Sequence, residues 1–138
     1  MKVFRCGVTP DYIDRLAESE VFVFGSNLQG MHGGGAARTA RLKFGAVMGQ
    51  GVGQQGQSYA IPTMQGGVDT IRPYVDQFAG FALRHPELRF LVTRIGCGIA
   101  GFRDEDIAPL FAGAAMLPNV CLPREFIDVL ERSGTTQR

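Results

Sequence analysis

The sequence has few cysteines, little net charge and no long apolar run, and each shortage excludes a class of protein. Cys6, Cys97 and Cys121 are scattered with no C-x-x-C spacing, so we expect neither a disulfide framework nor a zinc site, and a reducing cytoplasm is the expected location. A net charge of +1 is too small for a protein that binds nucleic acid mainly through its phosphates. Non-specific nucleic-acid binding is therefore not expected.

Membrane insertion is not expected either. No apolar run approaches the roughly 20 residues of a membrane span, and residues 1–5 lack the apolar core of a signal peptide. The chain of 138 residues fits one compact domain, residues 1–138, with a frayed tail at 133–138. Hydrophobic residues make up 45% of the chain and charged residues 20%, which is enough apolar material for one core.

Apolar runs and helical spacing alternate along the chain. They predict strands at residues 21–24, 58–62, 90–93 and 120–122. They predict helices at residues 10–18, 33–44, 69–83, 104–116 and 124–132. A glutamine-rich segment at 49–57 has no periodicity and is expected to be a loop, either a lid or a polar surface connection. This alternation predicts an α/β fold with a mostly parallel central sheet and helices on both faces.

Glycine is the abundant residue, with 19 copies, many of which fall in three segments. The first cluster follows the strand at 21–24 and leads into the helix at 33–44. Glycines let the main chain approach a ligand, and a helix N-terminus favours an anion such as a phosphate. We therefore expect this loop to bind a phosphate or a ribose, rather than to be a simple flexible connection. Its predicted contacts are Asn27, Gly33, Gly34, Gly35 and Ala36.

The second glycine loop follows the strand at 90–93 and has the spacing Gly96-x-Gly98-x-x-Gly101. Dinucleotide-binding folds have this spacing after their first strand, with an acidic residue about 20 positions later. Here the loop follows the penultimate strand, and no acidic residue stands at 118–120, so we reject an ordinary Rossmann dehydrogenase. The carboxyl ends of parallel strands form ligand sites, and we expect this loop to bind there too. Its predicted contacts are Gly96, Gly98, Ile99, Ala100, Gly101 and Phe102.

The two loops together resemble those of the macrodomain family. Asn27 followed by the run at 32–37, the middle strand at 58–62 and the run at 94–102 occur in the family's order, and the resemblance covers residues 21–116. The Arg-Ile-Gly-Cys-Gly form at 94–98 is similar to the branch that includes terminal ADP-ribose protein glycohydrolases. The resemblance implies a three-layer α/β/α macrodomain that binds ADP-ribose on the two loops, with neither a metal ion nor a cofactor.

The same resemblance implies where parts of the ligand lie. The diphosphate is expected between residues 33–36 and 98–102, with Asn27 and Phe102 beside the distal ribose. Macrodomains carry an early acidic residue that binds the adenine amine. The candidates for this role are Asp11, Asp14 and Glu20, among which the sequence does not choose.

The chain also departs from the glycohydrolase branch. The lysine that this branch has after its middle strand is replaced by Thr63-Met64-Gln65, and the aspartate of its second loop is replaced by Ala100. The lysine-and-aspartate mechanism therefore does not transfer to this chain.

Other residues are candidates for chemistry. His32 lies in the first loop and could act as a general base or donate to a phosphate, its alternative being a solvent-facing loop histidine. Asp104, like Asp106, could position a water near the distal ribose or simply cap a helix. Arg94 is expected to find an acidic partner or a phosphate. Cys97 has no neighbouring base and is expected to be a small packed residue.

Three functions remain open from the sequence. The first is a protein that binds ADP-ribose or a related nucleotide diphosphate, free or on an ADP-ribosylated macromolecule, and hydrolyses an ADP-ribosyl or related linkage. The second is a reader or sensor of the same nucleotide without catalysis. The third is a partner-binding scaffold in which the loops are vestigial.

Overall fold

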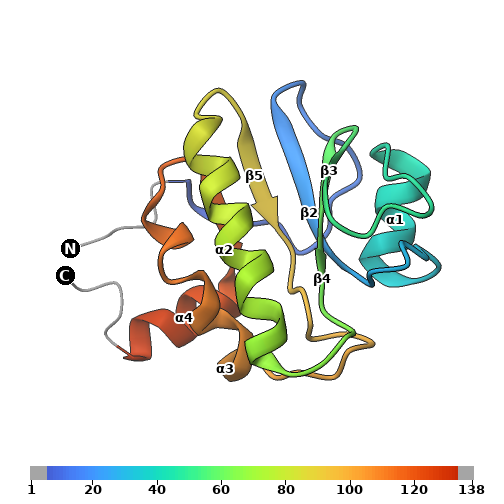
Figure 1. Ribbon diagram of the computed structural model, residues 1–138. Helices are drawn as coiled ribbons and strands as arrows, with labels where there is room; N and C mark the ends of the chain where they lie inside the picture. Colours follow the sequence, from blue (N-terminus) through green and yellow to red (C-terminus); the bar gives the residue numbers. More distant parts are fainter. Residues whose placement is uncertain (1–5, 134–138) are drawn as a thin grey trace.

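The structure is a computed structural model that describes residues 6–133. The expected absence of a signal peptide at residues 1–5 and the frayed tail beyond Ser133 lie outside the described residues. Six strands form one sheet in the order β1-β6-β5-β2-β4-β3 (Figure 1). The strands are β1 (Val8–Thr9), β2 (Glu20–Ser26), β3 (Gly53–Gln55), β4 (Ser58–Pro62), β5 (Arg89–Val92) and β6 (Val120–Pro123). Every neighbouring pair is parallel except β3 and β4, which confirms the mostly parallel sheet.

The helices are α1 (Gly35–Lys43), α2 (Val68–Arg84), α3 (Asp104–Ile107) and α4 (Arg124–Ser133). The single helix expected at 104–116 is broken into α3 and two 3-10 turns, η1 (Ala108–Phe111) and η2 (Ala114–Met116). Pro109 has no N–H to donate and Gly113 disfavours a continued helix, which explains the break. Over the described ranges, no helix combines the length and the apolar character that crossing a membrane requires.

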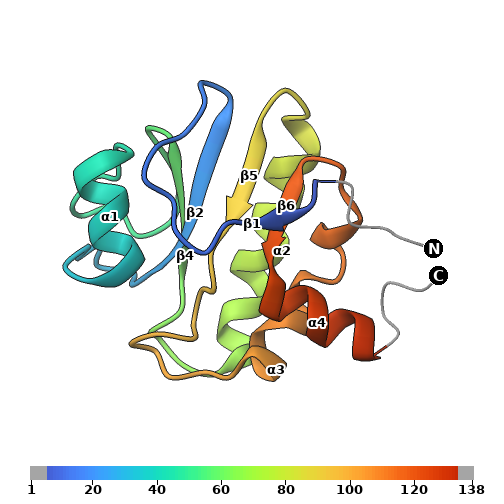
Figure 2. The ribbon, with the colours of Figure 1, turned by 180° about the vertical axis from the view of Figure 1, so that it is seen from behind.

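Side chains of β2 alternate between the two faces of the sheet. Val21 and Val23 belong to one apolar cluster together with residues of α2, η1 and α4. Phe22 and Phe24 belong to a second cluster, in which α1 supplies Ala37 and its neighbours. Helices therefore cover both faces of the sheet, an arrangement compatible with three α/β/α layers (Figures 1 and 2).

The helix predicted at residues 10–18 is not formed, and this segment runs as an irregular chain between β1 and β2. Ile13 and Leu16 do face inward as expected, because they pack against the apolar cluster under α1. An ion pair joins Asp14 to Lys43 of α1. These contacts with α1 and its apolar cluster hold the segment in place, although it forms no helix.

The structure also departs from the expectation of no disulfide framework. It joins Cys6 and Cys121 in a disulfide, with a Cα–Cα separation of 4.9 Å. No spacing pattern indicates this pair, because its members lie 115 residues apart. The parallel pairing of β1 with β6, which places Val8 opposite Leu122, brings them together.

Pairing of β2 with its neighbours fixes the edge of the sheet at which its loops emerge. Val23 lies opposite both Val92 of β5 and Tyr59 of β4. Because these three strands are parallel, their carboxyl ends lie at the same edge of the sheet. The first glycine loop, the turn after β4 and the second glycine loop all begin there.

Candidate functional site

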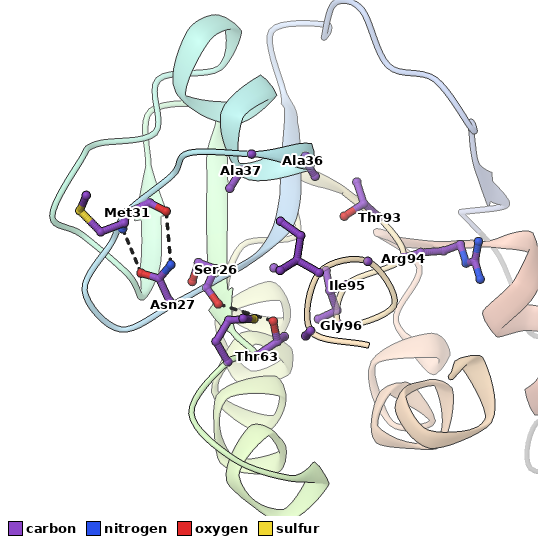
Figure 3. A pocket seen from close by; sticks show the side chains of 17 residues that line it. Ser26, Asn27, Met31, Ala36, Ala37, Thr63, Thr93, Arg94, Ile95 and Gly96 are labelled. Atoms are coloured by element: carbon purple, nitrogen blue, oxygen red, sulfur yellow. Dashed lines mark hydrogen bonds between the residues drawn. The ribbon is translucent and has the colours of Figure 1, made fainter. Parts of the chain in front are cut away.

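The two glycine loops meet across a cleft of about 320 Å³ at the carboxyl edge of the sheet (Figure 3). A Cβ atom added to Gly25 would lie 3.5 Å from the backbone nitrogen of Gly96, and one added to Gly34 would lie 3.5 Å from Cδ1 of Ile99. The loops are therefore in van der Waals reach of each other. The cleft is lined by Gly25, Ser26, Asn27, Met31, Gly34, Gly35, Ala36, Ala37, Thr63, Met64, Thr93, Arg94, Ile95, Gly96, Gly98, Ile99 and Ala100.

Eight of the predicted ligand contacts line this cleft, and three do not. Those that line it are Asn27, Gly34, Gly35, Ala36, Gly96, Gly98, Ile99 and Ala100. Those outside its lining are Gly33, Gly101 and Phe102. Phe102 packs against the core below the loop, where a Cβ added to Gly96 would lie 3.6 Å from its ring. The main chain of Phe102 closes the loop by donating to the carbonyl oxygen of Gly96 at 2.8 Å.

The N-terminus of α1 supplies hydrogen-bond donors to the cleft. Its first turn, Gly35 to Ala37, has N–H groups without an acceptor inside the helix. Gly34 occupies the N-cap position and contributes no side-chain cap, and the first turn contains no acidic residue. The small side chains leave these amides accessible to a ligand. This is the geometry in which helix N-termini bind anions.

Asn27 shapes the first loop by bonding to the main chain of Met31. Its Oδ1 accepts from the N–H of Met31 at 2.9 Å, and its Nδ2 donates to the carbonyl oxygen of Met31 at 3.3 Å (Figure 3). The side chain lines the cleft while both of its polar atoms already have partners within the loop. Its contribution to a ligand site therefore begins with holding the loop in shape.

His32 does not lie where either interpretation of the sequence put it. Its side chain is completely buried and does not line the cleft. Nε2 lies 3.0 Å from the carbonyl oxygen of Gln50 and 3.2 Å from Oε1 of Gln55, and the ring packs edge-on against Phe24. Both neighbours of Nε2 are acceptors, so this nitrogen carries the proton. His32 thus anchors the first loop instead of meeting a ligand, and a solvent-facing histidine is excluded.

The glutamine-rich segment is the support of the first loop. Gln55 is buried, and its amide holds the segment together by accepting from the N–H of Val47 at 2.7 Å and donating to the carbonyl oxygen of Gln50 at 3.1 Å. Part of the segment forms β3, which the sequence analysis missed because three residues give too short a pattern. The buried Gln55 excludes the purely surface loop that was one of the two expectations, although Gln54 and Gln57 are exposed.

Asp104 ties the second loop to α3. Nε and Nη2 of Arg94 donate to its two carboxylate oxygens, each at 3.0 Å, and Sγ of Cys97 donates to it at 3.4 Å. The acidic partner expected for Arg94 is thus present, and Arg94 points away from the cleft (Figure 3). Asp104 itself lines no described pocket, so the structure does not support its proposed role in positioning a water. Asp106 instead caps α3 by accepting from the N–H of Arg103 at 3.0 Å.

The thiol of Cys97 is held in its neutral form. Burial, followed by the hydrogen bond to Asp104 and the negative charge of that carboxylate, raises the pKa of Cys97 to about 12. A thiol with this pKa is a poor nucleophile near neutral pH. The expectation of a small packed residue therefore fits its environment.

A second pocket of about 260 Å³ adjoins the cleft and shares Ala36, Thr93 and Arg94 with it. Oγ1 of Thr9 and Oε1 of Glu125 are buried in its walls without a hydrogen-bond partner, and Oε1 of Glu125 forms an ion pair with Nε of Arg94 at 4.0 Å. No pattern in the sequence marks either residue as part of a site. Thr9 precedes the first long strand, and Glu125 lies in the first turn of a helix. The remaining lining residues are Pro10, Asp11, Tyr12, Ile13, Phe22, Thr39, Lys43 and Pro123.

The structure separates the three acidic residues that the sequence left equivalent. Asp11 lines the second pocket. Asp14 is paired with Lys43, which lowers the pKa of its carboxyl. Glu20 is paired with Arg89 at 2.8 Å. Asp11 is therefore the candidate of the three that faces a pocket.

The chain was compared with protein-family models, curated proteins and solved structures, and none of them matches it. In residues 6–133 no group of three or more histidine, cysteine or acidic side chains is arranged to hold a metal ion.

The packing of the first loop predicts that Gly30 tolerates no side chain. Gly30 has a φ of +71°, and an added Cβ would lie 2.3 Å from the backbone nitrogen of Gln50. We expect Gly30→Ala to lower the free energy of unfolding by about 2–4 kcal/mol, as measured by urea denaturation. Gly33→Ala is the matched control, because no atom lies within 4 Å of its added Cβ, and it should change stability by less than about 0.5 kcal/mol. Equal stabilities of the two variants would contradict this packing.

The environment of Cys97 predicts slow alkylation. With the disulfide intact Cys97 is the free cysteine, and its high pKa should make iodoacetamide react at pH 8 roughly a hundredfold or more slowly than with a thiol peptide. The rate should keep rising with pH up to about 12. Asp104→Asn removes the carboxylate that favours the neutral thiol and should accelerate the reaction. Asp128→Asn, on α4, is the control, and the same acceleration there would contradict the assignment to Asp104.

Proposed function

We propose that this chain is a macrodomain-like protein that binds ADP-ribose, or a related nucleotide diphosphate, across the cleft and the second pocket. One observation carries the proposal: two pockets at the carboxyl edge of the sheet join at Ala36, in the amide-rich first turn of α1. A dinucleotide-like ligand has the same arrangement, because a diphosphate joins its two ribose-linked ends in the way that the junction joins the two pockets. The order of loops that resembles macrodomains supports the same ligand.

The diphosphate is assigned to the junction of the two pockets. The first-turn N–H groups of α1 point their partial positive charge at an anion there. The main chain of Gly96 to Ala100 forms the opposite wall. Arg94 lines both pockets, but its guanidinium is turned away from the cleft and is paired with Asp104, so it contributes little charge at the junction. Binding would thus depend mainly on the main chain, which explains why small residues line both walls.

The base is assigned to the second pocket and the distal ribose to the cleft. The second pocket offers Tyr12, the hydroxyl oxygen of Thr9, which has no hydrogen-bond partner, and the carboxylate of Glu125, which is ion-paired with Arg94 at 4.0 Å. These oxygens are hydrogen-bond acceptors suited to an exocyclic amine, and Asp11 adds a further carboxylate at the same wall. In the cleft, Ser26, Thr63 and Thr93 donate their hydroxyl protons to main-chain carbonyl oxygens, so their hydroxyl oxygens remain as acceptors for a sugar.

Binding without catalysis is the form of this function that the cleft favours. Arg94 is the one ionisable side chain among the residues that line the cleft, so no general acid or base faces the distal ribose. His32 and Asp104, the catalytic candidates from the sequence, are engaged elsewhere. A scaffold with vestigial loops is disfavoured because the cleft is open rather than filled by its own side chains.

Calorimetric titration with ADP-ribose tests the binding proposal. Saturable binding is expected for the parent chain, and Gly34→Asp should weaken it by about tenfold or more, because a carboxylate at the N-terminus of α1 competes for the amides and repels the diphosphate. Aspartate is a favourable N-cap residue, so the variant should fold. Gly80→Asp adds the same charge on α2, outside both pockets, and is the control. No binding by the parent chain at millimolar ADP-ribose would reject the proposal.

Incubation with ADP-ribosylated protein separates a reader from a hydrolase. We expect the chain to retain the modified protein and to release no ADP-ribose, which chromatography of the supernatant would detect. Release that is lost in Gly34→Asp but kept in Gly80→Asp would establish hydrolysis in this cleft and overturn the assignment as a reader.

A further inference from the structure

The Cys6–Cys121 disulfide joins two segments that each lead into the wall of the second pocket. Three residues after Cys6 the chain reaches Thr9, and two residues after Cys121 it reaches Pro123, and both of these residues line the pocket. Figure 2 shows β1 beside β6. The covalent bond thus joins the two segments that form this side of the pocket.

A short strand pairing and several side-chain contacts hold the N-terminal segment beside the disulfide. β1 contributes two paired residues, Val8 opposite Leu122 and Thr9 opposite Pro123. Arg89 donates to the carbonyl oxygen of Cys6 before β1, and Asp14 is paired with Lys43 after it. A two-residue parallel pairing is short for a strand, and fixing each residue of an unattached segment costs about 1–2 kcal/mol of conformational entropy. The disulfide therefore adds a covalent attachment where the strand pairing is short.

The two sulfur atoms differ in their access to solvent. Cys6 is half-buried, whereas Cys121 is fully buried in β6. Arg89 donates from Nε to Sγ of Cys6 at 3.3 Å and from Nη2 to the carbonyl oxygen of Cys6 at 3.2 Å, while Nη1 is paired with Glu20. A neighbouring guanidinium favours the thiolate, which is the form that exchanges with disulfides. Cys6 is therefore the sulfur at which exchange with an external thiol or disulfide begins.

We propose that Cys6 and Cys121 form a thiol–disulfide modification site that controls the second pocket, with the oxidised pair ordering its wall for the ligand and the reduced pair loosening it. The proposal rests on the proposed nucleotide function for its ligand. Its partner is a low-molecular-weight disulfide such as glutathione disulfide.

Glutathione disulfide oxidises the two cysteines in two exchange steps. The thiolate of Cys6 attacks glutathione disulfide, forms a mixed disulfide and expels one glutathione thiolate. The thiol of Cys121 loses its proton to solvent, attacks the Sγ atom of Cys6 and expels the second glutathione. Two protein thiols are oxidised by two electrons to one cystine, and one glutathione disulfide is reduced to two glutathione molecules. Excess reduced glutathione reverses both steps.

The test compares the oxidised and reduced chain without ligand and then with ADP-ribose. Treatment with glutathione disulfide should leave Cys97 as the one residue that alkylates after unfolding, and treatment with dithiothreitol should free all three cysteines. Hydrogen exchange of residues 8–13 should be faster in the reduced chain. The dissociation constant for ADP-ribose should rise by about tenfold on reduction.

Two variants sharpen the test. Cys6→Ser should exchange and bind like the reduced chain, whatever the redox state of the buffer, whereas Cys97→Ser should keep the full response. Reduction of the parent chain gives the same information if Cys6→Ser does not fold. Failure of the pair to form in glutathione disulfide, or equal exchange at residues 8–13 in the two states, would overturn the proposal. Redox-dependent exchange with no ADP-ribose binding in either state would keep the thiol–disulfide site and reject the nucleotide function.

Discussion

The parallel pairing of β2 with β5 and β4 is the constraint on which the site depends. It starts three loops from one edge of the sheet and brings the loops so close that a Cβ added to Gly25 would lie 3.5 Å from the backbone nitrogen of Gly96. A larger side chain at Gly25 would therefore meet the second loop. The cleft is therefore built of main chain and small residues, and its hydrogen-bonding capacity lies in amides whose direction the sheet and α1 determine.

Amides bind an anion well only if they are already oriented, and the structure orients the first loop from behind. His32 and the buried Gln55 form the contact between this loop and the glutamine-rich segment. Asn27 closes the loop on itself through Met31. These polar side chains are thereby used for support, which leaves the cleft with few side chains of its own that could perform acid–base chemistry.

Charge is distributed unevenly along the site. At the second loop the guanidinium of Arg94 is held by Asp104 and turned away from the cleft, so its charge is partly neutralised. At the far end the second pocket carries the carboxylates of Asp11 and Glu125 and the amine of Lys43, and the Cys6–Cys121 bond joins two of the segments that lead into its wall. The part proposed to bind the diphosphate is therefore made of main chain, whereas the part proposed to bind the base is made of side chains.

Local patterns in the sequence were sufficient to predict strands at 21–24, 58–62, 90–93 and 120–122, which the structure has with slightly different ends, and the longer helices, because apolar periodicity and glycine placement report on neighbours along the chain. They were also sufficient to place both glycine loops at the carboxyl edge of the sheet. They failed at residues 10–18, where contacts with α1 replace helix formation, and at β1 and β3, which are too short to show a period. Only the tertiary structure decided that His32 is buried, that Asp104 binds Arg94, that Glu125 faces a pocket and that Cys6 meets Cys121. Each of these depends on residues brought together by strand order and helix packing, and the sequence pattern around one residue carries no information about a partner that lies far along the chain.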